Sequence, residues 1–107
     1  MTTENIVLKI EGFEWDRWNT QKNIRKHNVY PEECEEAFFN RAITGEISPE
    51  KSKGEQRYYL LGITGAERLL TVVFTIRKER IRVVSVRNMS RKERRFYEEK
   101  IKERAGI

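Results

Sequence analysis

Arginine is concentrated near the C-terminal end of this chain, in the stretch RIRVVSVRNMSRKERRFYEE at residues 80–99. Guanidinium groups suit phosphate, because their planar fork donates two parallel hydrogen bonds and keeps its charge at any physiological pH. The clustering of these side chains therefore indicates a polyanionic partner. Arg82 and Arg87 are the expected phosphate clamp, and Arg57 and Arg77 are further candidates.

Acid–base chemistry would have to come from few side chains. His27 is the only histidine, and histidine is the residue type whose ordinary pKa lies near neutrality, so it is the first candidate for a general acid or base. Glu55 could orient Arg57 or His27, or act as the base itself. Both have a structural alternative, since a histidine at a helix end interacts favourably with the helix dipole and Glu55–Arg57 is an ordinary same-face pair on a strand.

The arginines of the predicted strand have structural alternatives too. Arg82 could pair with an acid such as Glu55, lie at an exposed strand end, or project into a cleft that holds phosphate. A charged side chain in an apolar strand is costly to bury unless it is paired, so composition alone does not choose among these three.

Length and charge point the same way as the arginines. The chain has 107 residues with a net charge of +5, which predicts a single domain over residues 1–107 with a modest core, residues 1–12 being an N-terminal extension that includes a strand. Residues 77–104 hold twelve Lys or Arg against five Glu. A basic segment on a mildly acidic remainder favours nucleic acid as the partner.

Other classes of protein are disfavoured. One cysteine, Cys34, cannot form an internal disulfide, and one cysteine with one histidine does not make a standard zinc site. There is no glycine-rich phosphate loop, no signal peptide and no apolar run long enough for a membrane span. We therefore expect a cytoplasmic protein without metal, cofactor or membrane contact, in which Cys34 is a small core residue.

The first half of the chain predicts a strand and two helices. Alternation over residues 6–10 and again over 13–15 predicts an interrupted strand. Asp16 is a plausible N-cap for a helix over 17–27, with Asn28 as its left-handed C-cap. Pro31 can open the next helix, whose apolar face would contain Ala37 and Phe38.

The second half predicts an antiparallel β-meander and a terminal helix. Ser90 and Glu93 form a capping box, so a helix should run from residue 91 to about 104, with Phe96, Tyr97 and Ile101 as its packing face. The result is an α+β domain. The expected strands are 43–47, 57–64, 68–76 and 80–87, with a loop over 48–54.

Strand alternation also predicts which side chains share a face of the last strand. Arg82 should lie with Val84 and Val86, and Arg87 with Ser85 on the other face. Because Ile81 and Val83 are apolar as well, the strand is apolar on both faces and should be central and covered on both sides.

Several motifs, in order, resemble the BrnT family of toxins from bacterial type II toxin–antitoxin systems, which are similar in fold to RelE-like ribonucleases. Three departures stand out: Asn28 replaces a common glycine, Asn19 replaces a common lysine with Lys22 one turn later, and the loop at 50–54 has no histidine. The motifs are Phe13-Glu14-Trp15-Asp16, Asn23 followed by Arg25-Lys26-His27, Glu32-Glu33, Glu55-Gln56-Arg57, Leu61-Gly62, Arg68-Leu69-Leu70, Arg82-Val83-Val84-Ser85-Val86-Arg87 and Arg91-Lys92-Glu93-Arg94-Arg95-Phe96-Tyr97-Glu98.

The resemblance implies an endoribonuclease neutralised by a cognate antitoxin of the ribbon-helix-helix type, with DNA bound only through the complex. Cleavage without metal is expected to leave a 2′,3′-cyclic phosphate. The helix arginines could guide RNA or bind an acidic antitoxin surface, and Tyr97 could instead be core. The expected RNA contacts are Lys26, Arg77, Arg91, Arg94, Arg95 and Tyr97.

Two rival functions share the same fold. One is a toxin-fold binding module that acts with its antitoxin as a DNA-binding corepressor. The other is a general RNA-binding domain with Tyr58 or Tyr59 exposed on a basic sheet. Convergence of His27, Glu55, Arg82 and Arg87 on one cleft would favour the enzyme, whereas separate carboxylate partners for Arg82 and Arg87 would favour the binding module.

Overall fold

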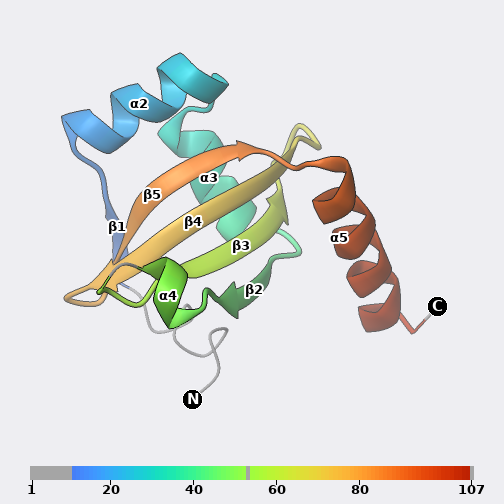
Figure 1. The fold of residues 1–107 in the computed structure, drawn as a ribbon. Helices are drawn as coiled ribbons and strands as arrows, with labels where there is room; N and C mark the ends of the chain where they lie inside the picture. Colours follow the sequence, from blue (N-terminus) through green and yellow to red (C-terminus); the bar gives the residue numbers. More distant parts are fainter. Residues whose placement is uncertain (1–10, 53, 107) are drawn as a thin grey trace.

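The computed structural model describes residues 11–52 and 54–106. Its strands form one five-stranded sheet in the order β1-β5-β4-β3-β2 (Figure 1). From β2 to β5 the strands form an antiparallel meander, and β1 runs parallel to β5. The predicted α+β fold is therefore confirmed, with a mixed sheet instead of a purely antiparallel one; the predicted strand at 6–10 lies outside the described residues. The strands are β1 (Gly12–Glu14), β2 (Ile43–Glu46), β3 (Tyr58–Ile63), β4 (Leu69–Arg77) and β5 (Arg80–Asn88).

The helices begin and end at the predicted caps. The Asp16 side chain accepts from the Asn19 backbone N–H, 2.9 Å away, and Asn28 ends the first long helix in the left-handed conformation with φ 53° and ψ 42°. Ser90 and Glu93 form the expected capping box. A short helix occupies the segment predicted as a loop. The helices are α2 (Arg17–His27), α3 (Pro31–Phe38), α4 (Pro49–Ser52) and α5 (Arg91–Arg104).

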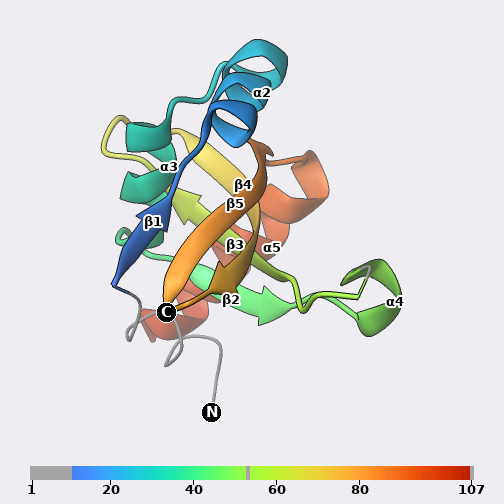
Figure 2. The ribbon, with the colours of Figure 1, turned by 90° about the vertical axis from the view of Figure 1, so that its left-hand side faces the viewer.

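The two faces of the sheet are covered differently. Seen from the side in Figure 2, α3 lies against one face while α4 and α5 lie towards the other. On the α3 face, Cys34 and Phe38 pack with Phe74 and other fully buried strand residues in the main core, as predicted for Cys34. The helix lies so close to β3 that a Cβ on Gly62 would be 2.3 Å from the Ala37 carbonyl oxygen, so this position requires glycine.

A β-bulge in β5 changes which side chains share a face. Phe74 pairs with Val83 and Val73 pairs with Ser85, which leaves Val84 as the extra residue. One extra residue reverses the alternation beyond it, so Val86 is buried at 1% exposure on the same side as Val83. The predicted sharing of a face by Val84 and Val86 was therefore wrong.

The same bulge brings Arg82 and Arg87 to one face. Their partners on β4 are Thr75 and Thr71, which alternate along an unbroken strand and so lie on the same side. The prediction that the two arginines lie on opposite faces was wrong, as was the expectation of a doubly covered strand. We call this side of the sheet, with Tyr59, Thr71, Thr75, Arg82 and Arg87, the open face; it faces the viewer in Figure 1.

On the open face, α5 covers one end through a second, smaller apolar cluster. Ile43, Leu61 and Tyr97 are its buried members, at 6%, 3% and 4% exposure. Tyr59 packs against this cluster, whereas Tyr58 is buried in the main core. The two adjacent tyrosines therefore point to opposite faces, and both pack against apolar clusters.

Side chains of α2 form hydrogen bonds with backbone groups at the free edge of β5. Because β1 ends at Glu14, opposite Arg82, the following residues of β5 have no strand partner on that side among the described residues. Asn19 Nδ2 donates to the Val83 carbonyl at 3.2 Å, Lys22 Nζ donates to the Val84 carbonyl at 3.0 Å, and Asn23 Oδ1 accepts from the Val86 N–H at 3.1 Å. Polar side chains one turn apart on α2 thus replace a neighbouring strand.

Replacing Asn23 with leucine should lower the free energy of unfolding by about 1–3 kcal/mol, because the buried Val86 N–H then has no acceptor. Urea denaturation at neutral pH measures the change. Gln21→Ala, at an exposed position of α2, is the matched control and should stay within about 0.5 kcal/mol of the wild type. Equal stability of Asn23→Leu and the wild type would contradict the edge role of this side chain.

Candidate active site

A cleft of about 250 Å³ opens on the open face between the first half of α2 and the adjoining parts of β4 and β5. We call it the basic cleft, because four of its lining side chains are cationic and Glu55 supplies a carboxylate. Its lining residues are Trp18, Asn19, Lys22, Glu55, Arg57, Thr75, Arg77, Arg82, Val83 and Val84.

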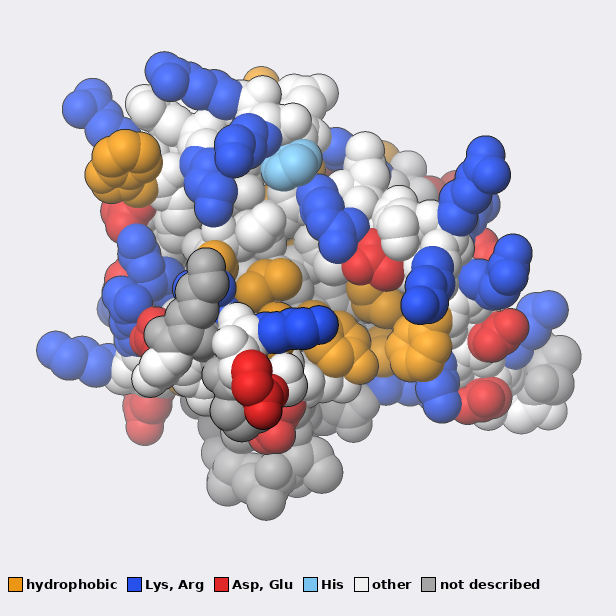
Figure 3. All heavy atoms as spheres, viewed as in Figure 1, with side chains coloured by type: hydrophobic (Ala, Val, Ile, Leu, Met, Phe, Trp, Pro, Cys, Tyr) orange, Lys and Arg blue, Asp and Glu red, His pale blue; other side chains and the backbone are white. Residues whose placement is uncertain are grey.

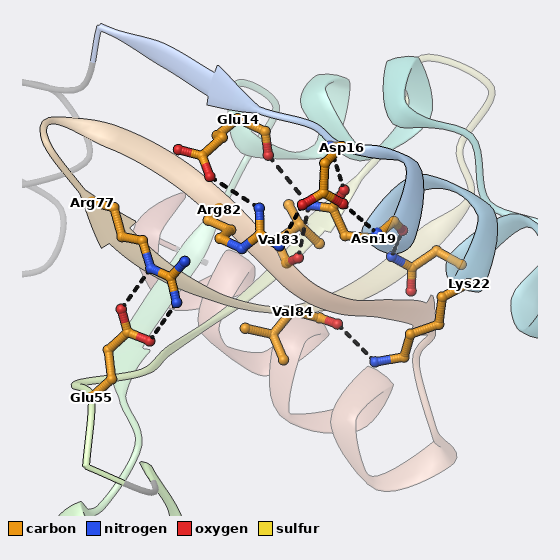
Figure 4. A network of polar contacts seen from close by, with 10 residues as sticks. Glu14, Asp16, Asn19, Lys22, Glu55, Arg77, Arg82, Val83 and Val84 are labelled. Carbon is orange, nitrogen blue, oxygen red and sulfur yellow. Dashed lines mark hydrogen bonds and ion pairs between the residues drawn. The ribbon is translucent and has the colours of Figure 1, made fainter.

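Arg82 is held by two carboxylates at the α2 side of the cleft (Figure 4). Its Nη1 lies 3.0 Å from Glu14 Oε1 and its Nη2 lies 2.6 Å from Asp16 Oδ2. Hydrogen bonds from the Asn19 backbone and from Arg82 lower the pKa of Asp16. Because Asp16 also caps α2, one carboxylate fixes both the start of that helix and the direction of the Arg82 side chain. These pairs use two of the five N–H donors of a guanidinium group.

Glu55 and Arg77 form the opposite side of the cleft in Figure 4. Arg77 Nε and Nη2 donate to the two oxygens of Glu55 at 2.9 and 3.1 Å. This bidentate pair lowers the pKa of Glu55, which keeps the carboxylate ionised at neutral pH. Arg57, which Glu55 was expected to orient, lines the cleft as well, and its charge lowers the pKa of Glu55 further, by less than the pair with Arg77 does.

The cations thus stand on two sides of one space. Lys22, bound to the Val84 carbonyl, and Arg82 lie on the α2 side, while Arg57 and Arg77 lie with Glu55. Such an arrangement can hold a phosphate by charge-assisted hydrogen bonds from opposite directions. It also places an ionised carboxylate within the same cleft, where it can accept a proton.

Arg87 lies outside the lining of the basic cleft, in a separate ion pair on the open face. Its Nη1 and Nη2 donate to the two oxygens of Glu93 at 2.7 and 2.9 Å. Glu93 also accepts from the Thr71 hydroxyl at 3.0 Å and from the Ser90 N–H at 2.8 Å. Arg87 therefore ties α5 to the sheet, and its hydrogen bonds lower the pKa of Glu93 to about 2.

His27 also lies outside the lining of the cleft. It ends α2, five residues after Lys22, which corresponds to about 7.5 Å along the helix axis. Its carbonyl accepts from Arg68 Nη2 at 2.9 Å, and Arg68 Nη1 bonds the Asn28 carbonyl at 2.8 Å. Lys26 precedes His27 in α2, lies one helical turn beyond Lys22, and has an exposed side chain.

The predicted RNA contacts on α5 differ in environment. Arg91 and Arg95 are exposed, whereas Arg94 pairs with Glu98 at 2.9 Å. Tyr97 is 4% exposed and its hydroxyl donates to the Arg41 carbonyl at 3.0 Å. Tyr97 is thus placed in the core, which was the structural alternative for this residue.

Convergence of the predicted residues on one cleft was expected to favour the enzyme, and separate carboxylate partners for the two arginines were expected to favour the binding module. The structure shows part of each. Glu55 and Arg82 share one cleft, together with Arg57 and Arg77, while His27 and Arg87 do not line it. Arg82 and Arg87 pair with different carboxylates.

Six of the ten residues that line the cleft were not among the predicted site residues, and Trp18 and Lys22 are the two of these that the proposed chemistry uses. Lys22 was noted only as a departure from the family pattern, and Trp18 was not singled out. The signal that could have found them is their spacing: residues i and i+4 of a helix lie on one face, and Asp16 had already been recognised as the cap that fixes where α2 begins. Both side chains line the basic cleft.

Comparison with known proteins identifies the family. A family model described as "ribonuclease toxin, BrnT, of type II toxin-antitoxin system" matches residues 15–93. The chain belongs to the BrnT family. The matched range begins at Trp15 and ends at Glu93, so it contains α2, the sheet from β2 to β5 and the lining of the basic cleft.

A solved structure agrees on the fold. The crystal structure of the Brucella abortus ribonuclease toxin BrnT is similar to this chain with a TM-score of 0.57 and 20% sequence identity, over 75% of this chain and 97% of that chain. No curated protein matches the chain. The resemblance to BrnT toxins inferred from the sequence is therefore confirmed.

Two further observations concern only residues 11–52 and 54–106. No helix there has the length and apolar character needed to cross a membrane. No group of three or more His, Cys, Asp or Glu side chains within these ranges is arranged to hold a metal ion.

The Glu93 pair predicts a dependence of stability on pH. The pKa of Glu93 falls from 4.5 to about 2 in the folded protein, so between these values the unfolded chain binds more protons and stability rises with pH. The contribution is complete above about pH 4.5 and is lost as pH falls towards 2. After discounting for the 27% exposure of the side chain, we expect it to be about 2 kcal/mol.

Glu93→Gln should therefore flatten the loss of stability between pH 4.5 and pH 2.5, measured by urea denaturation at several pH values. The matched control is Glu99→Gln, an exposed position of the same helix, which should keep the wild-type slope. Parallel pH curves for the wild type and Glu93→Gln would refute this assignment.

Proposed function

We propose that this chain is a metal-independent endoribonuclease that cleaves RNA in the basic cleft and leaves a 2′,3′-cyclic phosphate and a 5′-hydroxyl. It acts in the cytoplasm as the toxin of a type II toxin–antitoxin system. The observation that carries the proposal is the cleft itself: cations from α2, β4, β5 and the residue before β3 line one space together with the Glu55 carboxylate, in a chain whose family consists of ribonuclease toxins.

Cleavage needs a base for the 2′-hydroxyl, cations for the phosphate and an acid for the leaving oxygen. Arg57 and Arg82 bind the non-bridging oxygens and stabilise the charge that grows on them in the pentacoordinate transition state. Glu55, held ionised by Arg77, takes the 2′-hydroxyl proton as the 2′-oxygen bonds to phosphorus. Lys22 donates a proton to the 5′-oxygen as its bond to phosphorus breaks.

The other predicted residues act on the rest of the RNA or on the fold. Lys26 and His27 lie further along α2 and contact the next nucleotide. Arg91 and Arg95 are exposed at the start of α5 and guide the RNA backbone or bind the antitoxin. Arg87 acts indirectly, because its pair with Glu93 holds α5 against the sheet.

A second candidate function is a binding module without strong catalysis, which would repress transcription together with its antitoxin. The separate carboxylate partners of Arg82 and Arg87 favour it, because paired arginines are less available to phosphate. In both cases the proposed partner is an antitoxin of the ribbon-helix-helix type, and DNA is bound through the complex.

Arg82→Ala and Arg57→Ala should each lower the rate of RNA cleavage by at least about 100-fold, because each removes a phosphate-binding cation. Purified protein is incubated with RNA in a chelator, and cleavage sites are mapped at both new ends. Arg80→Ala, which removes an exposed arginine of β5 that does not line the cleft, is the matched control and should stay within a few-fold of the wild type. Urea denaturation confirms that each variant is folded.

The chemistry of the ends tests the mechanism. A 2′,3′-cyclic phosphate accepts a ligated adapter only after the ring is opened and the phosphate removed, whereas a hydrolytic 3′-hydroxyl end accepts it directly. Cleavage that requires added metal would contradict the proposal. Normal growth on induction, with intact RNA and with operator DNA bound by the toxin–antitoxin complex, would establish the binding module instead.

A further inference from the structure

Trp18 is an exposed tryptophan at the rim of the basic cleft. Its side chain is 83% exposed, although burying a large aromatic ring is normally favourable. The other tryptophan behaves in the ordinary way: Trp15 packs against the main core, and its Nε1 donates to Glu35 Oε2 at 2.7 Å. The exposure of Trp18 is therefore a local feature that the packing of the fold does not explain.

The surroundings of Trp18 are cationic. It lines the same cleft as Lys22, one helical turn later, and as Arg57 and Arg82. Among the described residues, the other exposed large hydrophobic side chains are Tyr30, Phe39 and Phe96, and none of them lines this cleft.

This setting fits a nucleobase better than a protein surface. Protein interfaces have an apolar core in which several hydrophobic side chains cluster, whereas no second exposed large hydrophobic side chain among the described residues lines the cleft with Trp18. Sites for single-stranded nucleic acid combine cations that follow the backbone with aromatic rings on which bases stack. The basic cleft has both parts.

We propose that Trp18 is a base-stacking subsite, whose indole ring stacks on the nucleobase next to the phosphate held in the basic cleft. The inference rests on the proposed function and adds a substrate class to it: unpaired RNA, because a base inside a duplex has both faces covered by its neighbours. Stacking accepts any base, since every base has a π face. Trp18 is thus a positioning residue that selects single strands without reading their sequence.

The geometry links this subsite to the phosphate. Asp16 caps the first turn of α2 and pairs with Arg82, and Trp18 lies in that same turn. Asp16 therefore contacts both the helical turn that carries Trp18 and the guanidinium group of Arg82. A base on Trp18 and its phosphate at Arg82 would be fixed relative to each other before the reaction.

The test measures binding apart from cleavage. A fluorescent 2′-O-methyl oligonucleotide has no free 2′-hydroxyl and stays intact, so anisotropy gives its affinity directly. Trp18→Ala should bind it about 5- to 150-fold more weakly than the wild type, and Trp18→Phe should recover part of the loss. Phe39→Ala is the matched control, because Phe39 is 80% exposed and does not line the cleft.

Abasic oligonucleotides distinguish stacking from a general effect of the substitution. Removing the base that contacts Trp18 should weaken binding to the wild type but not to Trp18→Ala, so that the two losses are not additive. A second probe is fluorescence: in Trp15→Phe, which keeps Trp18 as its one tryptophan, the single strand should quench emission and a duplex of the same sequence should not.

Each contrary outcome is informative. Unchanged affinity of Trp18→Ala, or additive losses with every abasic position, would overturn the stacking subsite while RNA cleavage by the wild type still supported the proposed function. A wild type that neither binds nor cleaves RNA would overturn both. Loss of antitoxin binding in Trp18→Ala, with RNA binding intact, would assign the side chain to a protein interface and overturn the inference.

Discussion

Three backbone groups of β5 obtain their hydrogen bonds from side chains of α2. The strand is bulged at Val84 and lies beyond the end of β1, so its edge would otherwise be unsatisfied at a cost of about 1–3 kcal/mol for each buried group. The side chains of Asn19, Lys22 and Asn23 form these hydrogen bonds. The helix must therefore lie along β5 with its polar stripe inward, and that position creates one wall of the basic cleft.

The bulge has a second effect, on charge. In a regular strand Arg82 and Arg87 would point to opposite faces, and one of them would enter the apolar core against α3. The extra residue places both on the open face, where carboxylates and solvent can surround them. Figure 3 shows Lys and Arg side chains around and partly across a central apolar area on this side of the molecule. Irregular backbone at one position thus allows a charged face and an apolar face on the same sheet.

The features that could be predicted from the sequence are those that depend on residues close together in the chain, such as helix caps and strand bounds. Asp16, Asn28 and the Ser90–Glu93 box set the bounds of two helices, because each cap acts within four residues of its own position. The strands of the meander were found within a residue or two, since alternation and short connections are also local. The family was recognised from motifs in order, which needs no knowledge of their contacts.

Features that join distant residues were not predicted. The bulge at Val84 depends on the pairing of β5 with β4 and on support from α2, and neither leaves a mark in the alternation of β5 itself. The acid suggested for Arg82 was Glu55, but Arg77 occupies that carboxylate and Arg82 pairs with Glu14, 68 residues away in sequence. Charge and residue type show which groups need partners, whereas only the fold decides which partners they have.

The internal pairing of the cleft arginines has a consequence for ionic strength. Binding of a polyanion usually weakens steeply as salt rises, in proportion to the number of phosphates that the protein neutralises. In the basic cleft, Glu14, Asp16 and Glu55 already offset much of the charge of Arg82 and Arg77. An RNA strand held there would depend less on net charge than on the directed hydrogen bonds of fixed guanidinium groups. The affinity for RNA would then decrease only slightly between low and physiological ionic strength. Other polyanions would bind weakly, because charge alone would contribute little to binding.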